Sequence, residues 1–269
     1  MFYHAKNGCV HICGDEMDYI VFGSGKQVMI MLPGIGDGLK TAKGMAIPFA
    51  LMYRMFAKDF RVYVFSRRRH LPEGDTTRDM AHDQIAAMDA LGIELADVVG
   101  VSMGGMIAQW MAIDSPDRVR KLVLAVTSSR INDILQDSVN TWRVLAQEED
   151  YHGLMLDSAK RMYSDGYLRK NRWMLPVMTR IGKPKSFQRF ITMCDACMEH
   201  CAYDRLPDIK AKTLIVAGDN DKALGCQASE DMALRIADCI LKVYEAYGHA
   251  VYEEEPDFKR TIMMYLLEE

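Results

Sequence analysis

The sequence predicts an α/β fold, in which a mostly parallel, eight-stranded sheet has helices on both faces and a helical cap inserted after the sixth strand. Strand-like runs rich in β-branched residues alternate with helix-like segments along most of the 269 residues. The alternation stops near residue 131 and resumes near residue 205. With 49% hydrophobic and 26% charged residues, the chain is long and apolar enough to bury a large core.

The expected elements follow one another in order. Strands are expected at 8–14 and 17–25, with a turn between them, and then at 27–34, 61–68, 96–102, 119–129, 211–221 and 239–249. Helices are expected at 44–59, 77–92, 104–116, 228–238 and 255–268. Pro48 should interrupt the first helix early. The second should begin at Thr76 or Thr77 and end at Gly92.

This pattern divides the chain into a core, residues 1–130 and 205–269, and a helical cap, residues 131–204. Open α/β sheets bind their ligands at the carboxyl ends of the strands. We therefore expect the cap to cover that edge of the sheet.

Charge and hydropathy exclude several classes of partner. The net charge is −4, and the one basic cluster, residues 67–69, is short enough to be a polar loop, so we expect no nucleic-acid partner. The N-terminus does not resemble a signal peptide, and no apolar run approaches a membrane span. The expectation is a cytoplasmic monomer or homodimer that binds a small-molecule substrate and has no membrane partner.

The seven cysteines are expected to be reduced thiols. Cys194, Cys197 and Cys201 have metal-like spacing, but this spacing also follows one face of a helix. A zinc site would need a fourth ligand, and His200 would point away from that face. We favour helix packing over a metal site, and we expect neither a metal nor an organic cofactor.

Residues 100–104 read Gly-Val-Ser-Met-Gly and match the pattern G-x-S-x-G. Ser102 ends a β-branched strand and precedes a helix, as in the strained turn called a nucleophile elbow. The flanking glycines avoid collisions in such a turn. The alternative is a plain glycine-rich connection between a strand and a helix.

A serine nucleophile needs a base and an acid that orients the base, here expected downstream. His249 directly follows a late predicted strand, and Asp219 and Asp221 follow the strand before it. The alternatives are a surface histidine and turn-forming aspartates. An oxyanion hole would take one backbone N–H from Met103 and a second from the loop 32–38, where Ile35 is the expected donor.

These four segments, "LPGIGDG", "GVSMGG", "GDND" and "GHAVYEEEP", resemble the α/β-hydrolase superfamily, in particular its cap-bearing esterase and C–C hydrolase branch. The resemblance covers essentially the whole chain and is weakest in the cap. It implies that Asp221 is the triad acid, with Asp219 in reserve. Pro33 replaces the histidine that usually precedes the glycine of the oxyanion loop, which alters the loop but should leave the Ile35 donor in place. Ser102 argues against relatives that use an aspartate nucleophile.

The favoured function is a serine carboxylesterase acting on a small or medium acyl ester. The alternatives are a C–C bond hydrolase or a lactonase with the same triad, a hydrolytically slow ligand receptor, and a cofactor-free lyase or oxygen-using relative. A substrate carboxylate would need a cation from the cap, where five candidates occur: Arg143, Lys160, Arg161, Arg180 and Arg189. The candidate apolar pocket residues are Trp142, Met155, Trp173, Met174 and Met178, although core packing is the favoured explanation for most of them.

Overall fold

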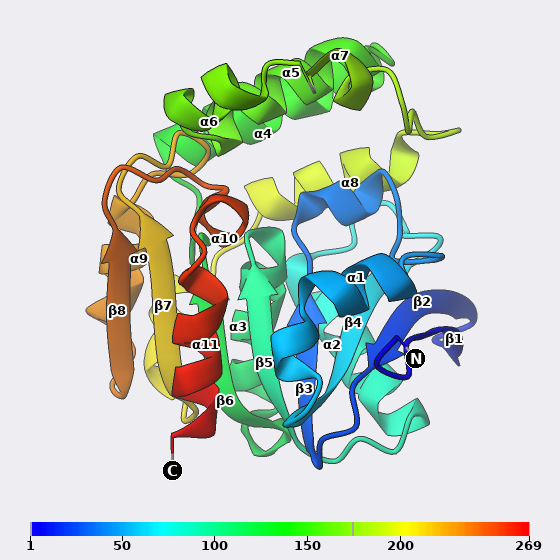
Figure 1. Cartoon of the computed structure of the whole chain (residues 1–269), viewed down its shortest axis with the longest axis vertical. Helices are drawn as coiled ribbons and strands as arrows, with labels where there is room; N and C mark the ends of the chain where they lie inside the picture. Colours follow the sequence, from blue (N-terminus) through cyan, green and yellow to red (C-terminus); the bar gives the residue numbers. More distant parts are fainter. Residues whose placement is uncertain (1, 174, 269) are drawn as a thin grey trace.

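The computed structural model describes residues 2–173 and 175–268. It contains one eight-stranded sheet in the order β1-β2-β4-β3-β5-β6-β7-β8 (Figure 1). The strands are β1 (Lys6–Ile12), β2 (Asp15–Phe22), β3 (Gln27–Leu32), β4 (Phe60–Arg68), β5 (Ala96–Val101), β6 (Val119–Ala125), β7 (Lys212–Gly218) and β8 (Cys239–Tyr244). The pairs β1–β2 and β2–β4 are antiparallel, and every later pair is parallel. The predicted fold class is confirmed.

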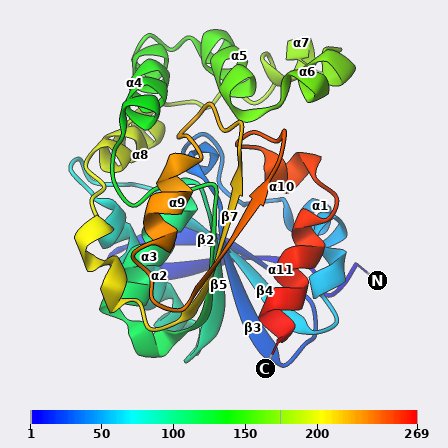
Figure 2. The same cartoon turned by 90° about the vertical axis from the view of Figure 1, so that its left-hand side faces the viewer.

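Helices cover both faces of this sheet (Figure 2). One face carries α1 (Ala46–Met52) and α11 (Phe258–Leu267), and the other carries α2 (Thr77–Ala90), α3 (Met103–Asp114) and α9 (Gln227–Ala233). Each face has its own buried apolar cluster. The near-continuous burial of β3, β5, β6 and β7 is what a parallel sheet covered on both sides requires.

Local signals explain where two of the helices begin and end. Thr76 caps α2 and forms a reciprocal capping box with Asp79, and Gly92 follows the helix with φ +66°. The predicted interruption at Pro48 is wrong. Pro48 lies in the first turn of α1, where its missing N–H has no intrahelical partner to lose. The helix instead gives way after Met52 to a short 3-10 turn, η2 (Arg54–Phe56).

The described residues between β6 and β7 form five α-helices above the carboxyl ends of the strands (Figure 1). They are α4 (Asp133–Gln147), α5 (Tyr151–Met162), α6 (Asp165–Asn171), α7 (Leu175–Met178) and α8 (Gln188–Met198). An isolated antiparallel β-bridge between Arg130 and Cys201 joins the two segments that connect these helices to the sheet. On this geometry we infer the division into core and cap that the sequence predicts, although the boundary at 204/205 falls inside the 3-10 helix η4 (Tyr203–Asp208).

The three clustered cysteines occupy different environments. Cys194 and Cys197 are buried on α8, whereas Cys201 is exposed beyond the end of that helix. His200 is buried and its Nδ1 lies 2.8 Å from the Thr77 hydroxyl. Among residues 2–173 and 175–268, no group of three or more histidine, cysteine or acidic side chains could hold a metal ion.

Candidate active site

Ser102 stands at the sharp turn between β5 and α3. Its backbone has φ +55° and ψ −123°, a strained combination for a residue with a side chain. The turn depends on its glycines: a Cβ on Gly104 would lie 2.0 Å from the Leu32 carbonyl oxygen, and one on Gly100 would lie 2.5 Å from the Gly104 oxygen. The predicted elbow geometry is therefore present, and it presents Ser102 at the edge of a cavity.

The structure brings His249 and Asp221 together below that cavity. His249 Nδ1 lies 2.8 Å from Asp221 Oδ2, and both side chains are buried. The other carboxylate oxygen, Asp221 Oδ1, accepts the N–H groups of Ala223 and Leu224. Because the Asp221 carboxylate accepts this hydrogen bond, Nδ1 of His249 is the donor and Nε2 is left as an acceptor. His249 and Ser102 line the same cavity.

Asp219 has a different partner. It is exposed, and its Oδ1 accepts the backbone N–H of Ala246 at 2.8 Å. This bond holds the turn after β8, and it does not involve His249. The geometry accordingly supports Asp221 as the orienting acid.

Both expected oxyanion donors lie at helix starts. Met103 is the first residue of α3 and Ile35 is the first residue of the 3-10 helix η1 (Ile35–Gly38), so neither N–H has a partner within its helix. The loop before η1 runs along the serine, since a Cβ on Gly34 would lie 3.3 Å from Ser102 Cβ. The expected donors therefore belong to the residue that follows Ser102 and to the residue that follows Gly34, whose backbone approaches the serine.

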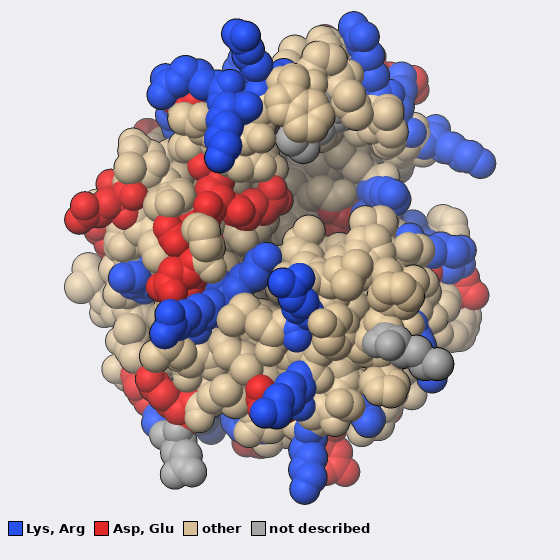
Figure 3. All heavy atoms as spheres, viewed as in Figure 1, with Lys and Arg blue, Asp and Glu red and all other residues tan. Residues whose placement is uncertain are grey.

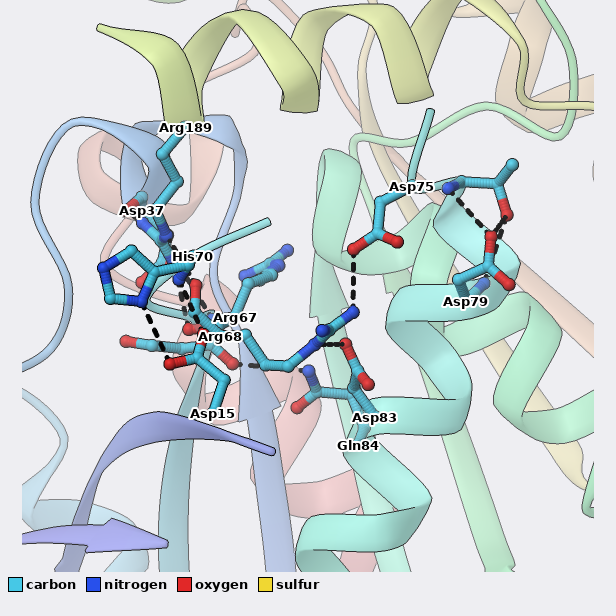
Figure 4. A network of polar contacts seen from close by, with 12 residues as sticks. Asp15, Asp37, Arg67, Arg68, His70, Asp75, Asp79, Asp83, Gln84 and Arg189 are labelled. Atoms are coloured by element: carbon cyan, nitrogen blue, oxygen red, sulfur yellow. Dashed lines mark hydrogen bonds and ion pairs between the residues drawn. The ribbon is translucent and has the colours of Figure 1, made fainter. Parts of the chain in front are cut away.

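A buried polar network supports this oxyanion loop (Figure 4). Arg67 Nη2 donates to the Pro33 carbonyl at 2.6 Å. Asp37, in η1, accepts the backbone N–H of Arg67 at 3.0 Å and Nη2 of Arg189 at 2.5 Å. Burial lowers the pKa of Arg67 to about 10, so it still carries its charge at neutral pH. The interpretation of residues 67–69 as a polar loop is wrong for Arg67, which is fully buried at the end of β4.

The cavity has a volume of about 410 Å³ and lies between the carboxyl edge of the sheet and the cap. Its wall is mainly apolar. The apolar members include Met45 and Phe49 of the α1 region and Trp142, Met155, Met162 and Phe190 of the cap. A volume of this size fits a small or medium organic molecule.

A family model described as "alpha/beta hydrolase fold" matches residues 27–256. The chain belongs to the α/β-hydrolase family. Among curated relatives, 3-oxoadipate enol-lactonase 2 of Acinetobacter baylyi is 24% identical over 245 residues, covering 89% of this chain and 88% of that protein. The 2-hydroxy-6-oxo-6-phenylhexa-2,4-dienoate hydrolase of Comamonas testosteroni is 29% identical over 277 residues, covering 94% and 93% of the two chains.

Solved α/β-hydrolase structures share the fold over nearly the whole chain. The enol-lactonase of Burkholderia xenovorans LB400 superposes with a TM-score of 0.82 at 23% identity, over 97% of this chain and all of that one. An esterase of Exiguobacterium antarcticum has a TM-score of 0.78 at 20% identity, over 98% of this chain and all of that one. These comparisons support the predicted hydrolase class, and they include enzymes for more than one kind of bond.

The pocket of this α/β-hydrolase only partly matches the expected one. Trp142 and Met155 line the cavity. The prediction for Trp173 is wrong, because its side chain is 70% exposed and lies outside the cavity wall. Met174 and the side chain of Met178 lie outside the described residues.

The sequence analysis missed the contribution of α1 to this wall. Met45 and Phe49 are four residues apart on one side of a short helix, a spacing that places them together. It also missed Tyr163, whose Oη donates to Glu253 Oε2 at 2.6 Å. Burial and the nearby carboxylate raise the pKa of Tyr163, so the phenol stays protonated beside the cavity.

Three of the cap arginines that could have bound a substrate carboxylate are already paired. Arg143 Nε lies 2.6 Å from Asp195, and Arg161 Nε lies 2.8 Å from Asp157. Arg189 is held by Asp37. Of the five cap cations considered, none belongs to the described cavity wall, to which Lys40 contributes a positive charge.

Proposed function

We propose that this α/β-hydrolase is a serine carboxylesterase that cleaves small or medium acyl esters with an uncharged acyl group. His249 Nε2 takes the proton of the Ser102 hydroxyl as Oγ attacks the ester carbonyl. The N–H groups of Met103 and Ile35 stabilise the oxyanion, and His249 then protonates the departing alcohol. Water, activated by His249, hydrolyses the acyl-enzyme to release the acid and regenerate Ser102.

One observation carries this proposal. A serine in a strained elbow shares a mostly apolar cavity with a histidine that is hydrogen-bonded to a buried aspartate. The apolar wall and the paired arginines of the cap favour an uncharged acyl group over a carboxylate-bearing one. Burying a charge without a partner would be costly.

A fluorophosphonate probe tests the nucleophile. Wild type should be labelled, and Ser102→Ala should lose both labelling and at least about 10⁴-fold in kcat. Ser158→Ala is a matched control, because Ser158 lines the same cavity without lying in the elbow. Equal labelling of wild type and Ser102→Ala would refute the assignment.

A series of p-nitrophenyl esters tests the substrate class. Each methylene buried in the apolar wall contributes about 0.8 kcal/mol, so kcat/KM should rise roughly fourfold per added CH₂ until the cavity is full. Probe labelling without turnover of any of these esters would contradict the esterase assignment and favour the second candidate.

The second candidate is a lactonase or C–C hydrolase with the same triad. It is favoured by the names of the relatives and by Lys40, whose position in the cavity wall suits a substrate carboxylate. In that case Lys40→Met should raise KM for carboxylate-bearing lactones and leave uncharged esters unaffected. If Lys40→Met leaves KM unchanged for both substrate classes, the hypothesis that Lys40 binds a substrate carboxylate is refuted.

A ligand receptor on this fold is separable from both enzymes. It would show thermal stabilisation by a ligand that is recovered unchanged, whereas a hydrolase releases product.

A further inference from the structure

The cap carries an unusual concentration of positive charge. Residues 166–194 contain seven lysines and arginines and no acidic residue, although the whole chain has a net charge of −4. Arg189 forms an ion pair with the buried side chain of Asp37. The other six are exposed: Arg169, Lys170, Arg172, Arg180, Lys183 and Lys185. We call this part of the surface, formed by the described residues 167–173 and 175–185, the basic cap edge.

Large apolar side chains are interspersed among these cations. Trp173, Val177 and Ile181 are all more than half exposed, and Trp173 and Ile181 are among the most exposed apolar residues described. Single exposed apolar residues are common on protein surfaces, whereas several that occur together mark a contact surface. A tryptophan among lysines and arginines is typical of segments that lie in a membrane interface.

The basic cap edge lies beside the entrance to the cavity. In Figure 2, α6 and α7 project on the same side of the molecule as α1. Figure 3 shows a hollow between the cap and the core on this side, with basic side chains projecting from the cap above it. The largest group of acidic side chains in that view borders the left of the hollow, and smaller ones occur among the basic side chains on its right.

The opposite rim of this hollow is also apolar. Met45, which precedes α1, and Phe49 are half-buried and line the cavity, whereas Ile47, Leu51 and Met52 of α1 are exposed. Exposed apolar side chains therefore occur both on α1 and on the cap, and the exposed cations of the basic cap edge lie on the cap.

We propose that the basic cap edge docks this enzyme on the surface of a bilayer that contains anionic phospholipids. The cations attract the lipid head groups, and Trp173, Val177 and Ile181 insert at the level of the head groups. The part of the chain that the structure describes has no helix of the length and hydropathy that a membrane span needs. Docking on a bilayer adds a partner that the sequence-based prediction of no membrane contact did not include.

A bilayer explains the surface better than a nucleic acid or an acidic protein does. A polyanion would be attracted by the cations, but it would leave the exposed aliphatic groups of Val177 and Ile181 without an apolar environment. A bilayer satisfies both kinds of group. It also holds apolar esters next to the cavity entrance, and the proposal does not depend on which bond the enzyme cleaves.

Flotation with vesicles of phosphatidylcholine, with and without phosphatidylglycerol, tests the proposal. Wild type and Ser102→Ala should both float with phosphatidylglycerol vesicles, remain behind with phosphatidylcholine alone, and be released by salt. Arg169→Gln/Lys170→Gln/Arg172→Gln should weaken binding roughly 100-fold, because each cation near such a surface contributes about fivefold. The matched control is Lys210→Gln/Lys212→Gln, exposed lysines at the amino end of β7, which should bind as wild type does.

Tryptophan fluorescence gives a second, site-specific measurement. The chain has three tryptophans, of which Trp110 and Trp142 are buried, so a blue shift on adding vesicles should come from Trp173 and vanish in Trp173→Phe. Wild type that stays unbound to phosphatidylglycerol vesicles would overturn the proposal. So would equal loss of binding in the control pair, or binding to DNA or polyglutamate without binding to vesicles.

Discussion

The contact between Arg189 and Asp37 makes a sharp test of how the cap supports the catalytic loop. Arg189 Nη2 lies 2.5 Å from Asp37 Oδ2, with side-chain exposures of 12% and 2%. Removing one partner of a buried ion pair costs about 3–5 kcal/mol, because the other charge is left buried without compensation. Since Arg189 is slightly accessible to water, we expect Arg189→Gln to lower the free energy of unfolding by about 3 kcal/mol.

Urea denaturation and thermal unfolding measure this loss. In a chain of this size about 3 kcal/mol corresponds to a decrease in Tm of roughly 6–12 °C. Arg143→Gln is the matched control, because its partner Asp195 is 43% exposed and such surface pairs contribute only about 0–1 kcal/mol. The kinetic consequence should be a lower kcat for esters, because Asp37 lies in the same short helix as the Ile35 donor.

A double-mutant cycle separates the pair from its surroundings. Asp37→Asn alone should also destabilise, whereas Arg189→Gln/Asp37→Asn should cost at least about 1 kcal/mol less than the two single changes together. Additive effects, or an Arg189→Gln protein within about 0.5 kcal/mol of wild type, would refute the reasoning.

Three further predictions follow from buried contacts. Gly104→Ala should abolish probe labelling or prevent folding, because its Cβ would collide with the Leu32 carbonyl oxygen. Gly36→Ala is the control and should fold normally, because the space around Gly36 is open. Circular dichroism and probe labelling compare the two variants. Lys121→Met should destabilise by about 1–3 kcal/mol and speed hydrogen exchange in α11, whose last carbonyls its buried Nζ binds. Burial lowers the pKa of His200 from 6.5 to about 3, so as the pH falls the unfolded state takes up this proton before the folded state does. The free energy of unfolding should therefore decrease as the pH falls from 6.5 towards 3. In urea titrations His200→Gln should flatten this decrease.

Much of the candidate site could be predicted from the sequence because its geometry is encoded locally. The elbow at Ser102 requires small residues where the backbones of β3 and α3 approach within van der Waals distance, and glycines in a strand-to-helix pattern indicate this directly. The positions of Asp221 and His249 follow from chain order, because parallel strands end at the same edge of the sheet.

The cavity wall was harder to predict because it depends on which face of each helix turns inward. Trp142 and Trp173 are both tryptophans of the cap, yet one is buried against Asp157 and the other is exposed. Helix α1 is too short for its periodicity to identify a buried face. Its contribution depends on the loop before it, which no pattern in the sequence specifies.

The three consecutive arginines show why a motif alone does not reveal what supports the catalytic loop. Successive side chains of a strand point to opposite faces, so Arg67 turns inward beneath Pro33 while Arg68 pairs with Asp75 and Asp83 on the other side. Burial lowers the pKa of Arg67, whereas Asp83 and Asp75 raise the pKa of Arg68. The sequence presents like charges in a row, and the register of β4 gives each a different environment. A shift of one residue in that register would leave the Pro33 carbonyl without its donor, so the oxyanion loop depends on strand pairing as much as on its own glycines.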